Sequence, residues 1–140
     1  MNNSLSQRMK TRLIGYWVTT VLAAVAFLAP GIANLTHSAH IVQDMTHLGY
    51  PLYFLTILGA WKVLGALVIV IPGYPRLKEW AYAGMLFDLT GAAVSRTIAG
   101  DGIAMAIIPL LIAGVVIASW ALRPPGRVLR GTGIAATTQK

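Results

Sequence analysis

Four long, mainly apolar stretches divide the chain, and each ends at charged, proline-rich or glycine-rich residues. A membrane-spanning helix needs about 20 apolar residues, so each stretch has the length of one span. The connections between the stretches are short, which makes consecutive helices antiparallel neighbours. The pattern therefore predicts an all-α polytopic membrane protein, an up-and-down bundle of four transmembrane helices. The predicted spans cover residues 13–35, 51–71, 80–98 and 103–122.

The first stretch follows the cations Arg8, Lys10 and Arg12, an arrangement that secretory signal peptides share. The apolar core of a signal peptide has about 7 to 15 residues, and the stretch in this chain is longer. We therefore expect an uncleaved membrane anchor.

Composition supports the membrane assignment. Of the 140 residues, 56% are hydrophobic and 11% are charged, whereas a soluble domain carries about 25% charged residues. The chain contains no cysteine, which excludes disulfides, thiolate metal sites and cysteine-bound iron–sulfur clusters. The length holds one membrane domain, expected over residues 1–125, and a flexible basic tail over residues 126–140.

The distribution of charge predicts the topology. Nine of the 11 lysines and arginines lie in the N-terminal arm, in the connection after the second span, or in the C-terminal tail. Because cytoplasmic segments are enriched in cations, we expect a multi-pass inner-membrane protein with both termini in the cytoplasm. These cations form no continuous basic face, so the pattern argues against nucleic acid as a partner. The lipid bilayer is the expected surrounding.

A short amphipathic segment, residues 36–50, separates the first two predicted spans. His37, His40, Asp44 and His47 follow one another at spacings of three or four residues and share one face of a helix. This pattern predicts an interfacial helix with a solvated polar face. The four side chains extend over about 15 Å of helix, too far to bind one ion, so we predict no metal site.

Two charged residues fall near the middle of predicted spans. Lys62 is near the middle of the second span and Asp88 near the middle of the third, so both are expected at one depth. A charge there costs about 2.5 to 3.5 kcal/mol on insertion scales, and such residues face the bundle and find partners. We therefore hypothesise an ion pair, either a static tie between helices or a ligand or proton site. The candidate ligand or ion-pair residues are Lys62, Asp88, Ser95, Trp61 and Glu79.

The third span also carries small residues beside its acidic residue. Gly84, Asp88, Gly91 and Ser95 share one helix face. Small residues let helices approach closely in lipid, which is the packing interpretation. Alternatively, the stripe leaves room beside Asp88 for a small ligand such as a quinone headgroup. Nearby aromatic residues suit a flat ring or, for Trp80 and Tyr82, a membrane interface: Trp61, Trp80, Tyr82 and Phe87.

Five short motifs carry a family resemblance. They are HLGYP at 47–51, GxWKxLG at 59–65, PRLKEWAYAG at 75–84, FDLTGA at 87–92 and LRP at 122–124. On these motifs the chain resembles the DoxX-like family of small four-helix membrane proteins, within the wider DoxX group. The resemblance covers nearly all of residues 16–125 and implies the same four-helix bundle.

The resemblance also bears on function. The DoxX group is named after a membrane subunit of a quinone-linked thiosulfate oxidoreductase, which implies a link to quinones. Two positions depart from the family pattern: Asn34 stands where a lysine is common, and Arg96 where a histidine often follows the serine. If those side chains share a redox or proton role, the role does not transfer directly to this chain.

From these patterns we expect a quinone-associated or accessory subunit of a redox complex, with no independent catalytic activity. Quinone is the one candidate cofactor, and a membrane protein or a second copy is a candidate partner. An alternative is a small-solute or proton-coupled carrier that uses Lys62 and Asp88. A further alternative is a structural subunit that assembles a larger complex.

Overall fold

The computed structural model describes residues 2–128 and is built of helices. Its five α-helices are α1 (Asn2–Leu35), α2 (Ala39–His47), α3 (Tyr53–Val70), α4 (Pro75–Ala99) and α5 (Ile103–Ala121), and a short 3-10 helix, η1 (Pro125–Arg127), follows them. The all-α prediction is thus confirmed for the described residues. Most of the expected tail, residues 129–140, lies outside them, and its first residues belong to η1.

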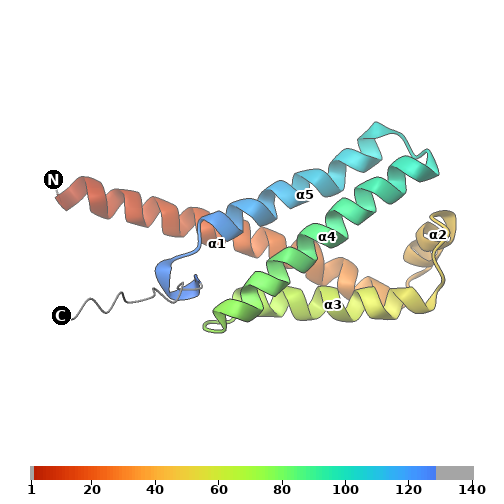
Figure 1. The fold of residues 1–140 in the computed structure, drawn as a ribbon, viewed down its shortest axis with the longest axis horizontal. Helices are drawn as coiled ribbons and strands as arrows, with labels where there is room; N and C mark the ends of the chain where they lie inside the picture. Colours follow the sequence, from red (N-terminus) through yellow and green to blue (C-terminus); the bar gives the residue numbers. More distant parts are fainter. Residues whose placement is uncertain (1, 129–140) are drawn as a thin grey trace, which may run out of the picture.

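Four long helices run alternately up and down (Figure 1). α1 packs against α3 and α5, and α4 packs against the same two helices, so the four form a closed ring. The start of α1, the α3–α4 connection and η1 lie at one end, here called the terminal end. The short helix α2 and the α4–α5 connection lie at the other, here called the α2 end.

Within residues 2–128, three helices are long and apolar enough to cross a membrane: α1, α3 and α5. α4 is not among them, although residues 80–98 were predicted to span. It has 25 residues, a length of about 37 Å, but it includes Arg76, Lys78 and Glu79 near its start and Asp88 and Arg96 further on. These charges lower its apolarity.

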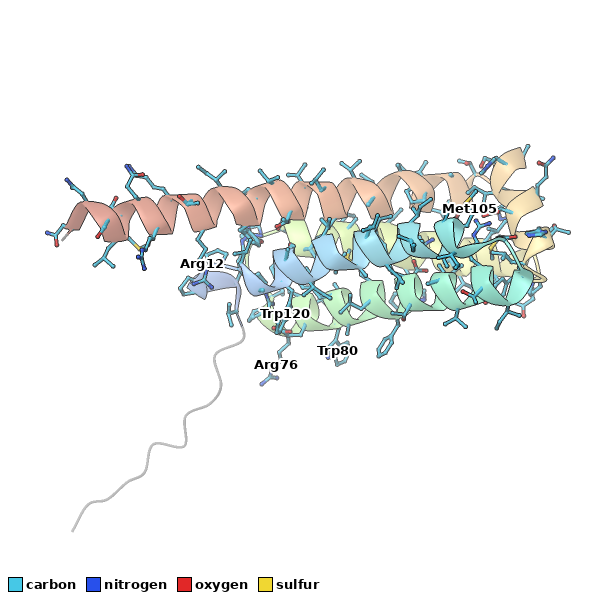
Figure 2. The ribbon with its side chains drawn as sticks, turned by 90° about the horizontal axis from the view of Figure 1, so that it is seen from above. Arg12, Arg76, Trp80, Met105 and Trp120 are labelled. Atoms are coloured by element: carbon cyan, nitrogen blue, oxygen red, sulfur yellow. The ribbon has the colours of Figure 1, made fainter. Side chains whose placement is uncertain are left out.

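α1 begins at Asn2, well before the predicted start at residue 13. The first turns contain no proline or glycine, so nothing in the sequence stops the helix where the charged arm begins. Figure 2 shows this N-terminal part of α1 projecting beyond the other helices, with Arg12 near the point where the bundle begins.

The seam between α1 and α3 is tight because two glycines lie in it. A Cβ atom added to Gly59 would lie 2.9 Å from the carbonyl oxygen of Gly31 and 2.8 Å from Cγ of Leu35. A Cβ atom added to Gly31 would lie 3.0 Å from Cβ of Lys62. Small residues of this kind let helix backbones approach in lipid, where van der Waals packing replaces the hydrophobic effect as the force between helices.

The core continues toward the terminal end as a mixed apolar and polar layer. Phe27, Ile69 and Met85 pack in its apolar part. Ser119 Oγ lies 2.7 Å from Thr20 Oγ1 and 2.8 Å from the Tyr82 hydroxyl, so α1, α4 and α5 share one buried hydrogen-bonded chain. Tyr82 is 2% exposed, so it faces the core and neither a membrane interface nor the candidate site.

Candidate functional site

The structure brings Lys62 and Asp88 together. Lys62 Nζ on α3 lies 3.6 Å from Asp88 Oδ2 on α4, with about a fifth of each side chain exposed. Equal depth in antiparallel neighbouring helices places the two side chains opposite one another. Within residues 2–128 neither side chain makes another hydrogen bond or ion pair, so the contact leaves donors of the ammonium and acceptors of the carboxylate free for a ligand.

An apolar pocket of about 480 Å³ adjoins this pair. We call it the apolar pocket. It lies between α3 and α4, and Trp61 and Trp80 contribute rings to its wall. Lys62 and Asp88 are its charged residues. Its lining consists of Phe27, Leu58, Trp61, Lys62, Leu64, Gly65, Val68, Leu77, Trp80, Ala81, Gly84, Met85 and Asp88.

A second pocket, of about 370 Å³, adjoins the same pair. We call it the polar pocket, because amide, hydroxyl, guanidinium and carboxylate groups contribute to its wall. Helices α1, α2, α3 and α4 all line it. Its lining consists of Pro30, Asn34, Ile41, Asp44, Met45, Leu48, Tyr50, Phe54, Leu58, Lys62, Phe87, Asp88, Gly91, Ala92, Ser95 and Arg96. The ion pair therefore lies where two pockets of different chemistry meet.

The small residues of α4 keep these pockets open. Gly84 lines the apolar pocket and Gly91 the polar pocket. A Cβ atom added to either would meet no atom within 4 Å. Within residues 2–128, neither glycine packs closely against another helix, and both line space beside Asp88.

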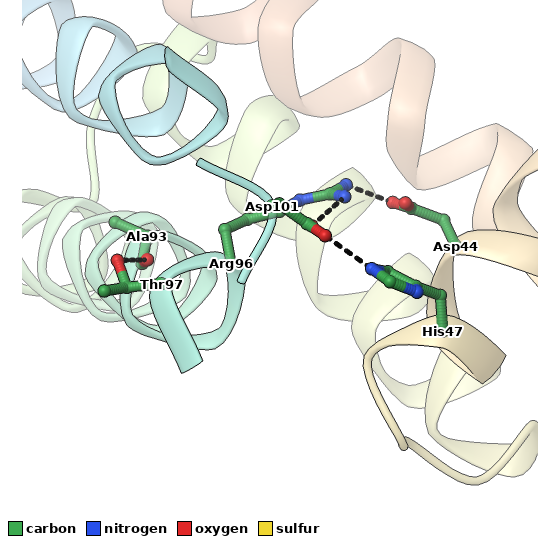
Figure 3. Close-up of polar contacts among 6 residues, drawn as sticks. All are labelled: Asp44, His47, Ala93, Arg96, Thr97 and Asp101. Carbon is green, nitrogen blue, oxygen red and sulfur yellow. Dashed lines mark hydrogen bonds and ion pairs between the residues drawn. The ribbon is translucent and has the colours of Figure 1, made fainter. Parts of the chain in front are cut away.

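Arg96 organises the α2 end (Figure 3). Its guanidinium binds the Asp44 carboxylate of α2 and, at 2.9 Å, the Asp101 carboxylate of the α4–α5 connection. His47 Nε2 lies 2.5 Å from the other oxygen of Asp101. These partners, first His47 and then Arg96, hold the pKa of the Asp101 carboxyl below its usual value of 3.8.

The predicted polar face of the interfacial helix needs correction. α2 covers Ala39–His47, so His37 precedes it, in a left-handed conformation, and bonds Thr56 at 3.0 Å. His40 and His47 are exposed, and Asp44 and His47 also bind residues of α4 and the α4–α5 connection. The location of α2 at a membrane interface stays a prediction. Among residues 2–128 no three His, Cys, Asp or Glu side chains form a metal-binding group.

Glu79 lies apart from the ion pair. Its carboxylate accepts hydrogen bonds from Arg123 at 2.6 Å and from the Trp120 indole at 2.9 Å. Arg123 is 3% exposed and stacks over Tyr82. Figure 2 shows Trp120 and Arg76 toward the terminal end. Glu79 therefore joins α4 to the end of α5, and the structure does not bring this candidate to Lys62 and Asp88.

Ser95 and Trp61 do reach the site, from opposite sides. Ser95 lines the polar pocket, where its hydroxyl lies 2.6 Å from the Tyr50 hydroxyl. Trp61 lines the apolar pocket and is largely exposed to the surroundings of the bundle.

A family model matches most of the described chain. The model of the DoxX-like family matches residues 18–119. The chain belongs to the DoxX-like family. The search of curated proteins and the search of solved structures each found no match. The match covers all residues of the two pockets and of the ion pair.

The two positions expected to depart from the family pattern, Asn34 and Arg96, line the same pocket. Asn34 from α1 and Arg96 from α4 both line the polar pocket, together with Lys62 and Asp88. Both positions therefore lie beside the candidate site.

Lys78 has a structural role that its sequence position did not predict. It was counted as a topology-determining cation, yet its side chain is fully buried and its ammonium donates to the carbonyl oxygens of Val68, at 2.5 Å, and Ile71. It thereby caps the C-terminus of α3, where free carbonyls favour a cation. The signal was available, because Pro72 stops α3 and Pro75 begins α4, so Lys78 lies in the first turn of the helix that follows the end of α3.

Proposed function

We propose that this DoxX-like protein is a four-span inner-membrane protein that binds a quinone beside Lys62 and Asp88, as an accessory component without independent catalytic activity. One observation carries the proposal. The two charged side chains line a pocket whose remaining lining is apolar or aromatic. Such a pocket suits a ligand that enters from lipid and needs a few polar contacts for orientation.

The chemistry of a quinone matches these groups. The Lys62 ammonium is a donor for a quinone carbonyl, and the Asp88 carboxylate is an acceptor for a hydroquinone hydroxyl. The flat ring suits the faces of Trp61 and Trp80, and an isoprenoid chain suits the aliphatic lining. Binding by these groups forms and breaks no covalent bond.

The fourth span and its orientation belong to the same proposal. α4 is long enough to cross a hydrocarbon core of about 30 Å, and it packs between the apolar helices α3 and α5. Pairing with Lys62 lowers the cost of placing Asp88 in the membrane. The terminal end carries Arg12, Lys78, Arg123 and Arg127, which supports its assignment to the cytoplasmic side.

The experiment is a titration of purified protein in detergent with decylubiquinone, followed by tryptophan fluorescence. We expect saturable quenching and a raised thermal midpoint, because a ligand of the folded state stabilises it. Asp88→Asn should weaken the affinity about tenfold, the equivalent of one charge-assisted hydrogen bond. Trp61→Phe should remove part of the quenching.

Asp101→Asn is the matched control. It makes the same chemical change at the α2 end, and Asp101 lines neither pocket. We expect its quinone affinity to equal that of the wild type. Absence of saturable quenching in the wild type, or equal affinities for the wild type and Asp88→Asn, contradicts the proposal.

A carrier function is the second candidate, favoured by the polar pocket on the other side of the ion pair. A carrier needs a site that is reached from both sides of the membrane in turn. Proton uptake into proteoliposomes, measured with an enclosed pH dye and lost in Asp88→Asn, would favour this function over quinone association.

A further inference from the structure

The polar pocket contains an amide that the bundle does not use. Asn34 on α1 is 3% exposed, yet its side chain makes no hydrogen bond to any of residues 2–128. Burying an amide without a partner costs about 1 to 3 kcal/mol. No side-chain nitrogen or oxygen that is completely enclosed lacks a partner among these residues, so the Asn34 amide retains contact with open space, and the polar pocket is the space that it lines.

Polar groups continue from this amide to the α2 end. Ser95 and Tyr50 contribute hydroxyls, and Arg96 and Asp44 contribute charges where α2 meets α4. About a quarter of each of the Arg96 and Asp44 side chains is exposed, so this part of the pocket is reached from outside. The lining includes two cations, Lys62 and Arg96, and two carboxylates, Asp44 and Asp88.

Space lined by such groups favours water, which binds where two to four polar partners are within reach. A pocket of about 370 Å³ holds several molecules, since one water occupies about 30 Å³ in the liquid. The apolar pocket has no comparable groups apart from the ion pair. The two pockets therefore offer the ion pair two different surroundings.

We propose that the polar pocket is a hydrophilic vestibule, which admits water and small hydrophilic solutes from the α2 end to Lys62 and Asp88, and that the Asn34 amide hydrogen-bonds them. This inference deepens the proposed function and rests on it, because it treats the ion pair as a ligand site. It means that a ligand dissolved in lipid and a solute dissolved in water reach one ion pair by separate routes.

The chain offers a clean experiment because it contains no cysteine. Gly91→Cys places a thiol in the polar pocket and Gly84→Cys places one in the apolar pocket, at glycines where a Cβ atom meets nothing within 4 Å. Each variant is reconstituted in vesicles and treated with trimethylammonioethyl methanethiosulfonate, which does not cross lipid. Gln43→Cys, on the exposed face of α2, identifies vesicles whose α2 end faces the reagent.

We expect the reagent to modify Gly91→Cys about tenfold faster than Gly84→Cys, because reaction needs a hydrated thiolate. The lipid-permeant N-ethylmaleimide should modify both variants. Ala23→Cys places its thiol in the fully buried core and should react with neither of the two reagents. Equal rates for Gly91→Cys and Gly84→Cys with the impermeant reagent, or no reaction of Gly91→Cys with either reagent, overturns the vestibule.

Asn34 is tested in the same background. Asn34→Leu keeps a side chain of similar size and removes the amide, so Gly91→Cys should be modified about tenfold more slowly as hydration is lost. Asn34→Ser retains a hydrogen-bonding group and should keep most of the rate. An unchanged rate in Asn34→Leu contradicts the role of the amide.

The outcomes separate the two proposals. Saturable quinone binding with an unreactive Gly91→Cys supports the apolar site and removes the vestibule. Rapid modification of Gly91→Cys in a protein that binds no quinone supports the vestibule and removes the quinone assignment.

Discussion

Helix α3 has two neighbours that it contacts in opposite ways. Along α1 the backbones meet at Gly31 and Gly59, where an added Cβ atom would lie within 3.0 Å of the other helix. Along α4 the glycines Gly84 and Gly91 face open space and line two pockets. We call these contacts the closed seam and the open seam. The same residue type therefore serves close packing in one seam and the formation of space in the other.

The difference shows where the molecule departs from what stability alone favours. Membrane helices gain their association energy from packing, so an open seam forgoes part of that energy. The open seam also contains Lys62 and Asp88, whose insertion is costly and whose mutual contact, at 3.6 Å, is loose. A loose charged pair beside unfilled space is typical of a binding site, because functional residues break the rules that serve the fold.

The largest expected effect is in the closed seam. Gly59→Ala should destabilise the protein by about 2 kcal/mol, because overpacking forces the α1 backbone to move. Gly65→Ala is the matched control on the same helix, since its Cβ atom would lie 3.5 Å from the flexible end of Met85. Thermal unfolding in detergent should give a lower midpoint for Gly59→Ala than for Gly65→Ala. Equal midpoints would remove the distinction between the seams.

The next effect concerns the ion pair of the open seam. Lys62→Met and Asp88→Asn should each cost about 1 kcal/mol, since each leaves one partly buried charge without its partner. The double variant should cost less than the sum of the two single variants, because it leaves no unpaired charge. A double-mutant cycle on thermal or denaturant unfolding measures the coupling. Additive costs would mean that the two side chains do not interact.

A smaller effect, of opposite sign, is expected at Gly84. Gly84→Ala should stabilise the protein by about 0.5 to 1 kcal/mol, because alanine is the better helix former and its Cβ atom meets no neighbour. The comparison with Gly59→Ala, which makes the same change in the other seam, uses the same unfolding measurement. A loss of stability in Gly84→Ala would show that the open seam closes in the membrane protein.

The smallest effect concerns the α2 end of the open seam. Because His47 and Arg96 lower the pKa of Asp101 in the folded protein, its carboxylate stabilises the fold above its usual pKa of 3.8. That contribution is lost as the pH falls from 3.8 through the lower folded value. The difference in thermal midpoint between the wild type and Asp101→Asn should therefore shrink below this pH. A difference that stays constant from neutral to acid pH would contradict the ion cluster.

Much of the fold was predictable because apolar length and helix breakers are local properties of the sequence. The three apolar helices and the Gly100 to Gly102 turn follow from such signals. α4 was predicted to begin at residue 80, but it begins at Pro75, because its first turns are charged and hydropathy does not mark them. The start of α1 was misplaced at residue 13 because hydropathy marks where apolar residues begin and says nothing about where a helix begins.

The candidate site was predictable only in part. Equal depth suggested that Lys62 and Asp88 meet, because helix rise converts sequence position into height. The contact of Arg96 with Asp44 depends on how α2 folds back over α4, which no local pattern specifies. The role of Asn34 depends on which face of α1 remains unpacked, and its hydrophobic surroundings gave no sign of a pocket.

The most direct test of the account is the quinone content of the open seam. Gly84→Leu places a larger side chain in the apolar pocket, and Ala83→Leu makes a similar addition at an exposed neighbour outside its lining. Native mass spectrometry of protein purified from quinone-containing membranes should find bound quinone in the wild type and in Ala83→Leu. Gly84→Leu should have lost the quinone, and its thermal midpoint should equal that of wild-type protein freed of quinone. No quinone in the wild type, or equal quinone in all three proteins, would contradict the account.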